Sequence, residues 1–263
     1  MAKRILYQLE RVQVSLGGKP VLHDVHGVIT QGSFLGLIGP NGAGKTTLIR
    51  TLAGTLRPRH GRIKLTGKSL SGFARRDLAR SLAVVPYALE VPVAFTVEEC
   101  VAMGRMPYLS GWAALSKHDR ALMCEAMETT DALTMAHRPL HSLSGGERHR
   151  AMVAMALAQE PEILILDEPT AHLDLHHAWG LMELVKKLHE ERGLTIIMSC
   201  HDLNLAGTFC NELLLLNEGK VERWGATGEV MVSTVLSQVY QYPLDVVRIG
   251  PVGRWVVPNW VSR

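Results

Sequence analysis

A glycine-rich segment holds the residues whose types and spacing could do chemistry. Residues 39–47 read GPNGAGKTT and satisfy the pattern G-x-x-x-x-G-K-[ST]. In such a loop the glycines let successive backbone N–H groups surround phosphate oxygens, while Lys45 reaches the β- and γ-phosphates and the Thr46 hydroxyl coordinates Mg²⁺. We therefore expect a nucleotide site built from Gly39, Pro40, Asn41, Gly42, Ala43, Gly44, Lys45, Thr46 and Thr47.

Two adjacent carboxylates form the second candidate group. Asp167 and Glu168 directly follow the apolar run 163–166. Asp167 is expected to hold the hydration shell of Mg²⁺, and Glu168 to polarise an attacking water. An exposed acidic strand end explains these residues equally well when they are taken alone. The phosphate loop in the same chain favours the catalytic interpretation.

A second anion-binding segment is predicted at residues 143–147, which read LSGGE and precede a run of good helix formers. A serine, two glycines and a helix N-terminus together present backbone N–H groups to an anion. An ordinary Ser-x-x-Glu helix cap explains the same residues, and in isolation it is the simpler interpretation.

Short apolar runs are expected to position these groups. Residues 34–39 predict a buried strand that leads through the glycine-rich loop into a helix over 46–56, and this context argues against a plain glycine turn. Residues 163–166 and 195–199 predict two more buried strands, the second of which ends near His201. Ligands of parallel α/β sheets bind at the carboxyl ends of the strands, so the loop, the carboxylates and His201 are expected to converge.

The rest of the chain predicts three further parts. Residues 5–16 alternate imperfectly and run into a glycine turn, which predicts an opening strand and hairpin. Residues 96–158 carry helical patterns, with a capping box at residues 96–99 and helices over 117–130 and 146–159. A terminal hairpin is expected around residues 250–253.

Composition excludes several classes of protein. The 263 residues are 47% hydrophobic and 20% charged, which is globular and neither disordered nor collagen-like. No apolar run approaches the roughly 18 residues of a spanning helix, and no signal peptide is expected, so we expect a cytosolic location. Four widely spaced cysteines suggest neither a disulfide framework nor a zinc site, and a net charge of +3 is too small for a nucleic-acid footprint.

In type and order, these motifs resemble those of the ATP-binding subunits of ABC transporters. Residues 143–147 match that family's signature, residues 39–46 its P-loop, and residues 163–168 its Walker B strand. Residues 171–174, AHLD, match its D-loop, and His201 matches its switch histidine. The resemblance spans nearly the whole chain.

The resemblance implies an α/β fold: a P-loop NTPase (RecA-like) core with a parallel-rich sheet, an N-terminal antiparallel β part and an inserted helical subdomain. Residues 1–86 and 160–242 would form the ATP-binding core. Residues 87–159 would form the helical subdomain with the signature, and residues 243–263 a C-terminal extension.

The resemblance also implies roles and partners. Glu168, His201 and Lys45 would be catalytic, with ATP and Mg²⁺ as cofactors. Two copies would pair head to tail, so that one copy's signature closes the other's ATP site in trans. Further nucleotide contacts would come from Ser144, Gly145, Gly146, Glu147, Leu16 and Asp174. Integral membrane permease subunits would be direct partners and a substrate-binding protein an indirect one, at the cytoplasmic face of the cell membrane, with no nucleic acid.

Finer features resemble importers of siderophore-bound iron, haem and vitamin B12. These features are residues 101–108, the pair Asp119 and Arg120, and the tail segments 239–243 and 256–258. Two other interpretations stay open. One is a soluble ABC-type ATPase clamp, although such proteins usually carry long insertions or duplicated cassettes. The other is a non-hydrolytic ATP-gated scaffold, against which the retained catalytic residues argue.

Two positions depart from the family pattern. Leu16 stands where an aromatic ring usually stacks on adenine, so only apolar contact is expected there. Tyr87 stands where a glutamine usually contacts Mg²⁺ and the transport-sensing groove, and a phenol cannot supply the same neutral carbonyl ligand. Either these residues are tolerated variants, or metal coordination and coupling differ in this chain. Three histidines at 172, 176 and 177 favour dimer contacts over metal binding.

Overall fold

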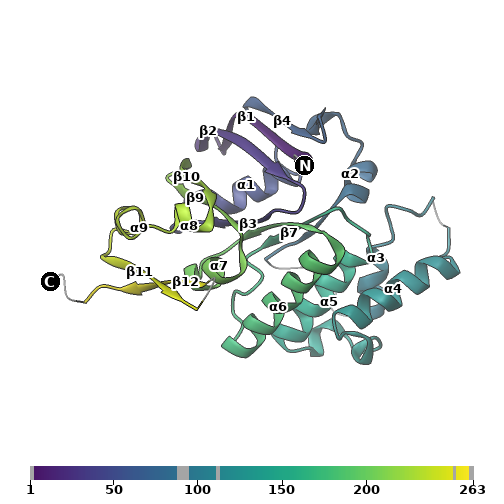
Figure 1. Ribbon diagram of the computed structural model, residues 1–263. Helices are drawn as coiled ribbons and strands as arrows, with labels where there is room; N and C mark the ends of the chain where they lie inside the picture. Colours follow the sequence, from purple (N-terminus) through teal and green to yellow (C-terminus); the bar gives the residue numbers. More distant parts are fainter. Residues whose placement is uncertain (1–2, 88–94, 111–112, 251–252, 261–263) are drawn as a thin grey trace. The chain divides into compact units, whose positions relative to one another are not determined.

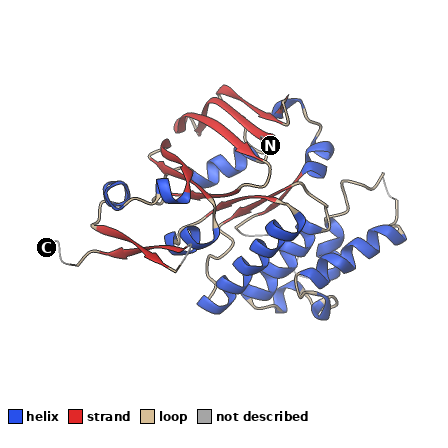
Figure 2. Ribbon diagram, in the orientation of Figure 1, coloured by secondary structure: helices blue, strands red, loops and turns tan. Residues whose placement is uncertain are grey.

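The computed structural model describes residues 3–87, 95–110, 113–250 and 253–260. The chain is mixed α/β (Figures 1 and 2). It divides into two compact units. The first comprises residues 1–72 and 195–263, and the second comprises residues 73–194. The expected helical subdomain, residues 87–159, falls within the second unit, and its functional boundaries remain a proposal. No helix in the described ranges has the length and apolar content that crossing a bilayer requires.

Parallel strands form the centre of the first unit. β3 (Phe34–Ile38) lies between β8 (Thr195–Ser199) and β9 (Glu212–Asn217) and runs parallel to both, while β10 (Lys220–Ala226) pairs antiparallel with β9. Every residue of β3 and β8 is buried. Strands buried on both faces need continuous rather than alternating apolar sequence, which is what these segments carry.

An antiparallel sheet forms the N-terminal part of the first unit, as the resemblance implied. β1 (Ile5–Leu16) pairs with β2 (Lys19–Thr30) on one side and with β4 (His60–Leu65) on the other, and β5 (Lys68–Ser69) pairs with β4. The connection at residues 17–18 consists of two glycines with positive φ angles, which suits a tight hairpin turn. The predicted opening strand and hairpin are confirmed.

The helices of the first unit are α1 (Lys45–Leu52), α7 (Leu203–Phe209), α8 (Thr227–Val230) and α9 (Ser233–Tyr240), with a 3₁₀ turn, η1 (Leu70–Gly72). The prediction that the helix after the glycine-rich loop extends to residue 56 is wrong. The N–H groups of Thr55 and Leu56 both donate to the carbonyl of Arg50, at 3.0 and 3.1 Å. Gly54, which directly precedes these two residues, has φ 73°, a left-handed conformation that ends a helix.

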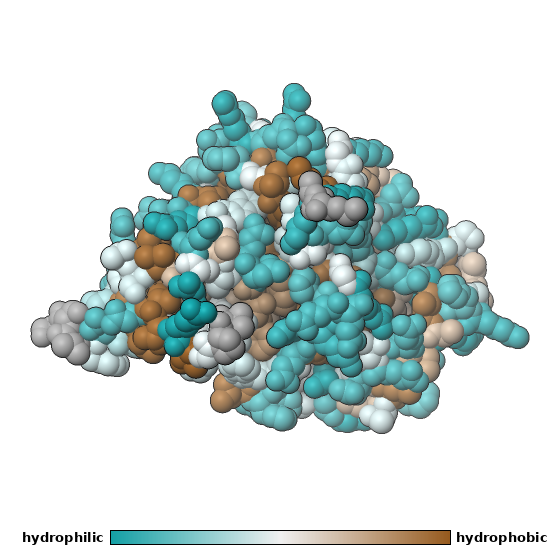
Figure 3. All heavy atoms as spheres, viewed as in Figure 1, coloured by the Kyte–Doolittle hydropathy of each residue, from teal (hydrophilic) through white to brown (hydrophobic). Residues whose placement is uncertain are grey.

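A hairpin forms the C-terminal part of the first unit. β11 (Leu244–Ile249) pairs antiparallel with β12 (Gly253–Pro258), so the predicted terminal hairpin is confirmed. Brown, apolar side chains gather at the surface over this region in Figure 3. Val247, Ile249 and Trp260 are 37%, 49% and 75% exposed.

The second unit is mostly helical. β6 (Leu82–Val85) pairs in parallel with β7 (Ile163–Asp167). The helices are α2 (Arg75–Ser81), α3 (Val97–Met103), α4 (Lys117–Thr129), α5 (Gly145–Leu157) and α6 (Leu175–Arg192), with 3₁₀ turns η2 (Leu133–Met135) and η3 (Leu140–Ser142). α5 is central, because α3, α4 and α6 all pack against it. The core of this unit includes four buried methionines, Met123, Met127, Met135 and Met152.

Reciprocal caps fix where three of these helices begin. In each, a Ser or Thr side chain accepts from the backbone three residues later, and the acid there accepts from the cap's own N–H. The pairs are Thr96 with Glu99, Ser116 with Asp119, and Ser144 with Glu147. Each box satisfies two N–H groups that a helix start leaves without intrahelical partners.

A buried arginine holds the helices together. Arg105 is 2% exposed and donates to Asp119 at 2.9 Å, to Glu160 at 2.9 Å and to the carbonyl of Ala158 at 2.7 Å. Its guanidinium carbon lies 4.0 Å from the ring centre of Tyr108. Removing a partner of a buried cation is destabilising, because it leaves buried charge uncompensated.

Candidate active site

The glycine-rich loop joins β3 to α1, as predicted. β3 ends at Ile38 and α1 begins at Lys45, so residues 39–44 form the loop between a buried strand and a helix start. Gly39 has φ 142°, and a Cβ atom added there would lie 2.0 Å from the backbone oxygen of Leu216 on β9. Only glycine fits this position, because the approach to β9 and the backbone conformation both exclude a side chain.

The ammonium group of Lys45 lies on the loop itself. Lys45 is 4% exposed, and its Nζ donates to the carbonyl oxygens of Gly39 at 2.7 Å and Pro40 at 3.0 Å. Asn41 and Gly42 are exposed, and Thr46 is half-buried at the helix start. The first turn of α1 contains no acidic residue, so its N–H groups and the lysine form a positive site that suits phosphate. The donor set therefore fits a nucleoside triphosphate, and the Thr46 hydroxyl suits the Mg²⁺ that such a ligand carries.

The β1–β2 hairpin passes beside this loop. A Cβ atom on Gly44 would lie 2.7 Å from Cδ2 of Leu22 on β2, so loop and strand are in close contact. Leu16 ends β1, pairs with Lys19 and is 40% exposed. Its contact with adenine remains a prediction.

His201 follows β8 at the same edge of the sheet as the loop. Leu37 of β3 is paired with Ser199 of β8, and the next N–H, that of Cys200, donates to the carbonyl of Leu37 at 3.0 Å. The parallel pairing therefore brings the loop and the exposed His201 to the same strand ends, as predicted. Burial raises the pKa of the Cys200 thiol to about 12.

The two carboxylates belong to the second unit. Asp167 ends β7 and is 6% exposed, while Glu168 is half-buried. Glu168 has φ 52°, and its carbonyl accepts from the N–H of Ala171 at 3.1 Å. This left-handed turn carries the chain from the strand into the D-loop. The approach of these carboxylates to the glycine-rich loop remains a prediction.

The structure shows the helix-cap interpretation of residues 143–147, and the anion-binding interpretation remains a prediction. Ser144 caps α5, and its N–H donates to Oε2 of Glu147 at 2.7 Å, as in an ordinary helix cap. That bond and the Ser144 hydroxyl lower the pKa of Glu147, as does Arg138, which donates to its other oxygen at 2.8 Å. Gly145 and Gly146 lie in the first turn of α5, where the predicted anion site needs their N–H groups.

The D-loop ends at a capped helix. The Asp174 side chain accepts from the N–H of His177 at 2.9 Å and contacts Nδ1 of the same residue at 2.8 Å. The backbone bond is the main cause of the lowered pKa of Asp174. No group of three or more His, Cys, Asp or Glu side chains suited to a metal ion occurs within the described ranges.

Tyr87 makes a contact that the sequence analysis missed. Its hydroxyl forms a hydrogen bond with Nε2 of His172 in the D-loop. The two ring centres lie 5.7 Å apart, with an angle of 58° between the ring planes. Tyr87 is 45% exposed. Eighty-five residues separate the pair along the chain, so no local pattern pointed to it.

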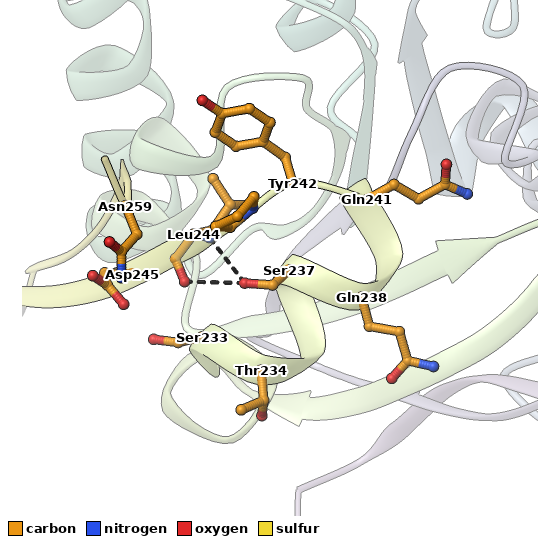
Figure 4. A pocket seen from close by; sticks show the side chains of 10 residues that line it. Ser233, Thr234, Ser237, Gln238, Gln241, Tyr242, Leu244, Asp245 and Asn259 are labelled. Carbon is orange, nitrogen blue, oxygen red and sulfur yellow. Dashed lines mark hydrogen bonds between the residues drawn. The ribbon is translucent and has the colours of Figure 1, made fainter. Parts of the chain in front are cut away.

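A groove of about 550 Å³ lies elsewhere, beside α9 and β11 (Figure 4). The hydroxyl of Ser237 accepts from the N–H of Leu244 at 2.9 Å and donates to its carbonyl at 3.1 Å, which ties the two elements together. Hydroxyl and amide side chains and the carboxylate of Asp245 line it. None of the residues predicted to bind the nucleotide lines this groove.

Comparison with known proteins identifies similar sequences. A family model described as ABC transporter matches residues 22–171. The chain is 39% identical over 238 residues to the iron(3+)-hydroxamate import ATP-binding protein of Bacillus subtilis, covering 90% of this chain and 88% of that protein. It is 41% identical over 235 residues to the petrobactin import ATP-binding protein of Bacillus anthracis, covering 89% and 86%. It is 40% identical to the hemin import ATP-binding protein of Streptomyces coelicolor, covering 89% and 83%.

Solved structures share the fold. A transporter assigned to the metal-chelate type, in an inward-facing conformation, has a TM-score of 0.85 at 26% identity and covers 98% of both chains. A dimeric bacterial ABC transporter cassette has a TM-score of 0.74 at 27% identity, covering 84% of this chain and 99% of that one.

Proposed function

The chain belongs to the ABC transporter family as one of its ATP-binding subunits, and on that premise we propose that it powers the uptake of a metal chelate through a partner permease. It is an ABC-type ATPase. The cargo is an iron–siderophore, haem or cobalamin complex, and it crosses the membrane through the permease rather than through this subunit.

The observation that carries this proposal is the extent of the similarity. The metal-chelate transporter covers 98% of this chain, whereas the dimeric cassette covers 84%. The relatives named for hydroxamate, petrobactin and hemin import are each about 40% identical over at least 89% of the chain. A soluble ATPase clamp is not favoured, because neither the relatives nor the transporter of known structure is of that kind.

We assign roles to the site residues on this basis. Lys45 and the loop N–H groups bind the β- and γ-phosphates, and Thr46 and Asp167 hold Mg²⁺, which neutralises phosphate charge when bound. Glu168 accepts a proton from the attacking water, and His201 orients the γ-phosphate. The buried lysine and the acid-free start of α1 support the phosphate assignment.

We further propose that two copies build each ATP site together. The P-loop of one copy is closed by Ser144, Gly145 and Gly146 of the other, while the D-loop and Asp174 lie at the contact between copies. Support comes from the dimeric cassette of similar fold and from the capped helix start that residues 144–146 form. ATP binding then closes the dimer and hydrolysis reopens it, which drives the permease between its access states.

In this proposal the subunit lies on the cytoplasmic face of the membrane and is held there by the permease. A substrate-binding protein delivers the chelate on the opposite side and contacts the permease rather than this chain. ABC import subunits work with membrane permeases, and none of the described helices could itself cross a bilayer.

Transport by a reconstituted complex tests the proposal. The chain and its permease, in vesicles loaded with ATP, should take up a ferric hydroxamate, haem or cobalamin supplied with its binding protein. The Glu168→Gln variant should bind ATP but not transport. Glu191→Gln, a matched change on the exposed face of α6, should transport at the parental rate.

Two results would contradict the proposal. One is ATP hydrolysis without uptake of any of the three chelate classes. The other is an ATPase that does not associate with the permease.

A further inference from the structure

The contact between Tyr87 and His172 is not explained by the roles assigned so far. Tyr87 stands where the family resemblance places a metal-contacting glutamine, yet its hydroxyl is hydrogen-bonded to Nε2 of His172. The centre of its ring lies 5.7 Å from the centre of the imidazole, and the two ring planes are tilted by 58°. The tyrosine is thus directed towards the D-loop of its own chain.

The contact involves a residue, His172, whose backbone is in a sparsely populated conformation. Its φ is 62°, in the left-handed region that residues with a side chain seldom adopt. The next N–H along the chain, that of Leu173, donates to the carbonyl of Thr170 at 3.3 Å. A side-chain bond to His172 therefore helps hold the D-loop in this conformation.

The D-loop in turn packs against the signature helix of the same chain. A Cβ atom on Gly145 would lie 3.3 Å from Cδ2 of Leu173, and one on Gly146 would lie 2.4 Å from Cδ2 of His177. No spare space separates the D-loop and the start of α6 from the first turn of α5. A shift of the D-loop must therefore move this turn or lose the contact.

We propose that Tyr87 and His172 are positioning residues for ATP hydrolysis: their hydrogen bond holds the D-loop, and through Leu173 and His177 the D-loop places the first turn of the signature helix. The inference rests on the proposed function, because it assumes that the signature turn completes an ATP site. It goes beyond that function by giving Tyr87 a partner in place of a metal ion.

A double-mutant cycle on ATP hydrolysis by the purified full-length chain tests the coupling. Tyr87→Phe and His172→Ala should each lower kcat about fivefold, the factor that one hydrogen bond of ordinary strength supplies, with KM for ATP within about twofold. The double variant should be no slower than the slower single variant, because the same bond is lost in all three. Both side chains are exposed, so the variants should fold.

Tyr108→Phe is the matched control. It removes a tyrosine hydroxyl that donates to the carbonyl of Gln159 at 2.9 Å in the same unit, away from the D-loop. It should leave kcat unchanged. The positioning role would be overturned if the double variant lost kcat by the product of the two single losses. It would also be overturned if Tyr108→Phe lost as much kcat as Tyr87→Phe.

A second measurement tests the bond without any activity. The imidazole nitrogen resonances of His172, assigned with His172→Ala, should shift in Tyr87→Phe at a fixed pH and stay in place in Tyr108→Phe. Unchanged His172 resonances in Tyr87→Phe would show that the hydrogen bond does not form. Shifted resonances with an unchanged kcat would overturn the positioning role. Absence of chelate uptake by the complete transporter would contradict the proposed import function and leave this result standing.

Discussion

Lys45 is held in place by the loop that it serves. Its ammonium group donates to the carbonyls of Gly39 and Pro40 and is 4% exposed. Taking a cation out of water is costly, and an anion that binds beside it offsets that cost. We therefore expect the loop to bind phosphate with little rearrangement.

Gly39→Ala should disrupt this loop. A Cβ atom would lie 2.0 Å from the Leu216 oxygen at a φ of 142°, so the free energy of unfolding should fall by about 2–4 kcal/mol and ATP binding should be lost. Gly72→Ala, whose Cβ atom would lie 3.7 Å from its nearest neighbour, should change stability by less than about 0.5 kcal/mol. Urea unfolding and nucleotide titration measure both, and equal effects would refute the assignment of a special role to Gly39.

Glu168→Gln should separate binding from hydrolysis. The amide keeps the size of the side chain but cannot accept the proton of the attacking water, so turnover should fall by about 10²-fold or more while ATP affinity persists. Phosphate release and nucleotide binding are measured on the same preparation. If the variant hydrolyses ATP at the parental rate, another group is the general base.

Residues of the phosphate loop could be predicted because their pattern is local: nine consecutive residues specify the turn, the lysine and the helix start. The bond between Tyr87 and His172 could not be predicted, because it depends on how the D-loop turns 85 residues further along the chain. The positive φ of His172, a residue with a full side chain, has no sequence signal of its own.

At the scale of elements, helix starts were easier to predict than helix ends. Capping boxes are readable in the sequence, and the box at Thr96 and Glu99 is where it was expected. α1 ends early because Gly54 adopts a left-handed conformation, and a glycine in sequence does not reveal its φ. The network around Arg105 was also not predicted, because its partners come from α4 and from the end of α5.

The stability that this network contributes depends on pH through Asp119. Hydrogen bonds from the hydroxyl and N–H of Ser116, and then the Arg105 guanidinium, lower its pKa to about 2 from an ordinary 3.8. Because the pKa is lower in the folded chain, the carboxylate contributes stability that is fully present above about pH 4 and is lost as pH falls towards 2. The stability gap between wild type and Asp119→Asn should thus be constant above pH 4 and shrink below it. Urea unfolding at several pH values measures the gap, and a gap that does not narrow in acid would contradict the assignment.

At the scale of the whole molecule, the central claim is that two copies build each ATP site. The order of motifs along the chain suggested this through a family resemblance, and the similar dimeric cassette supports it. A single chain's sequence cannot specify such pairing directly, because the contact between copies joins residues of different molecules. The claim is decided by whether the Lys45 and the Ser144 that serve one ATP site come from different copies.

Hydrolysis by mixed dimers carrying Lys45→Ala and Ser144→Arg measures this most directly. With the two lesions in different copies, a head-to-tail dimer has one site with both lesions and one intact site. With both lesions in one copy, each of its sites carries one lesion. The account therefore predicts ATP hydrolysis by the first dimer and almost none by the second. Hydrolysis only when both lesions share one copy would show that each chain completes its own site, and would contradict the account.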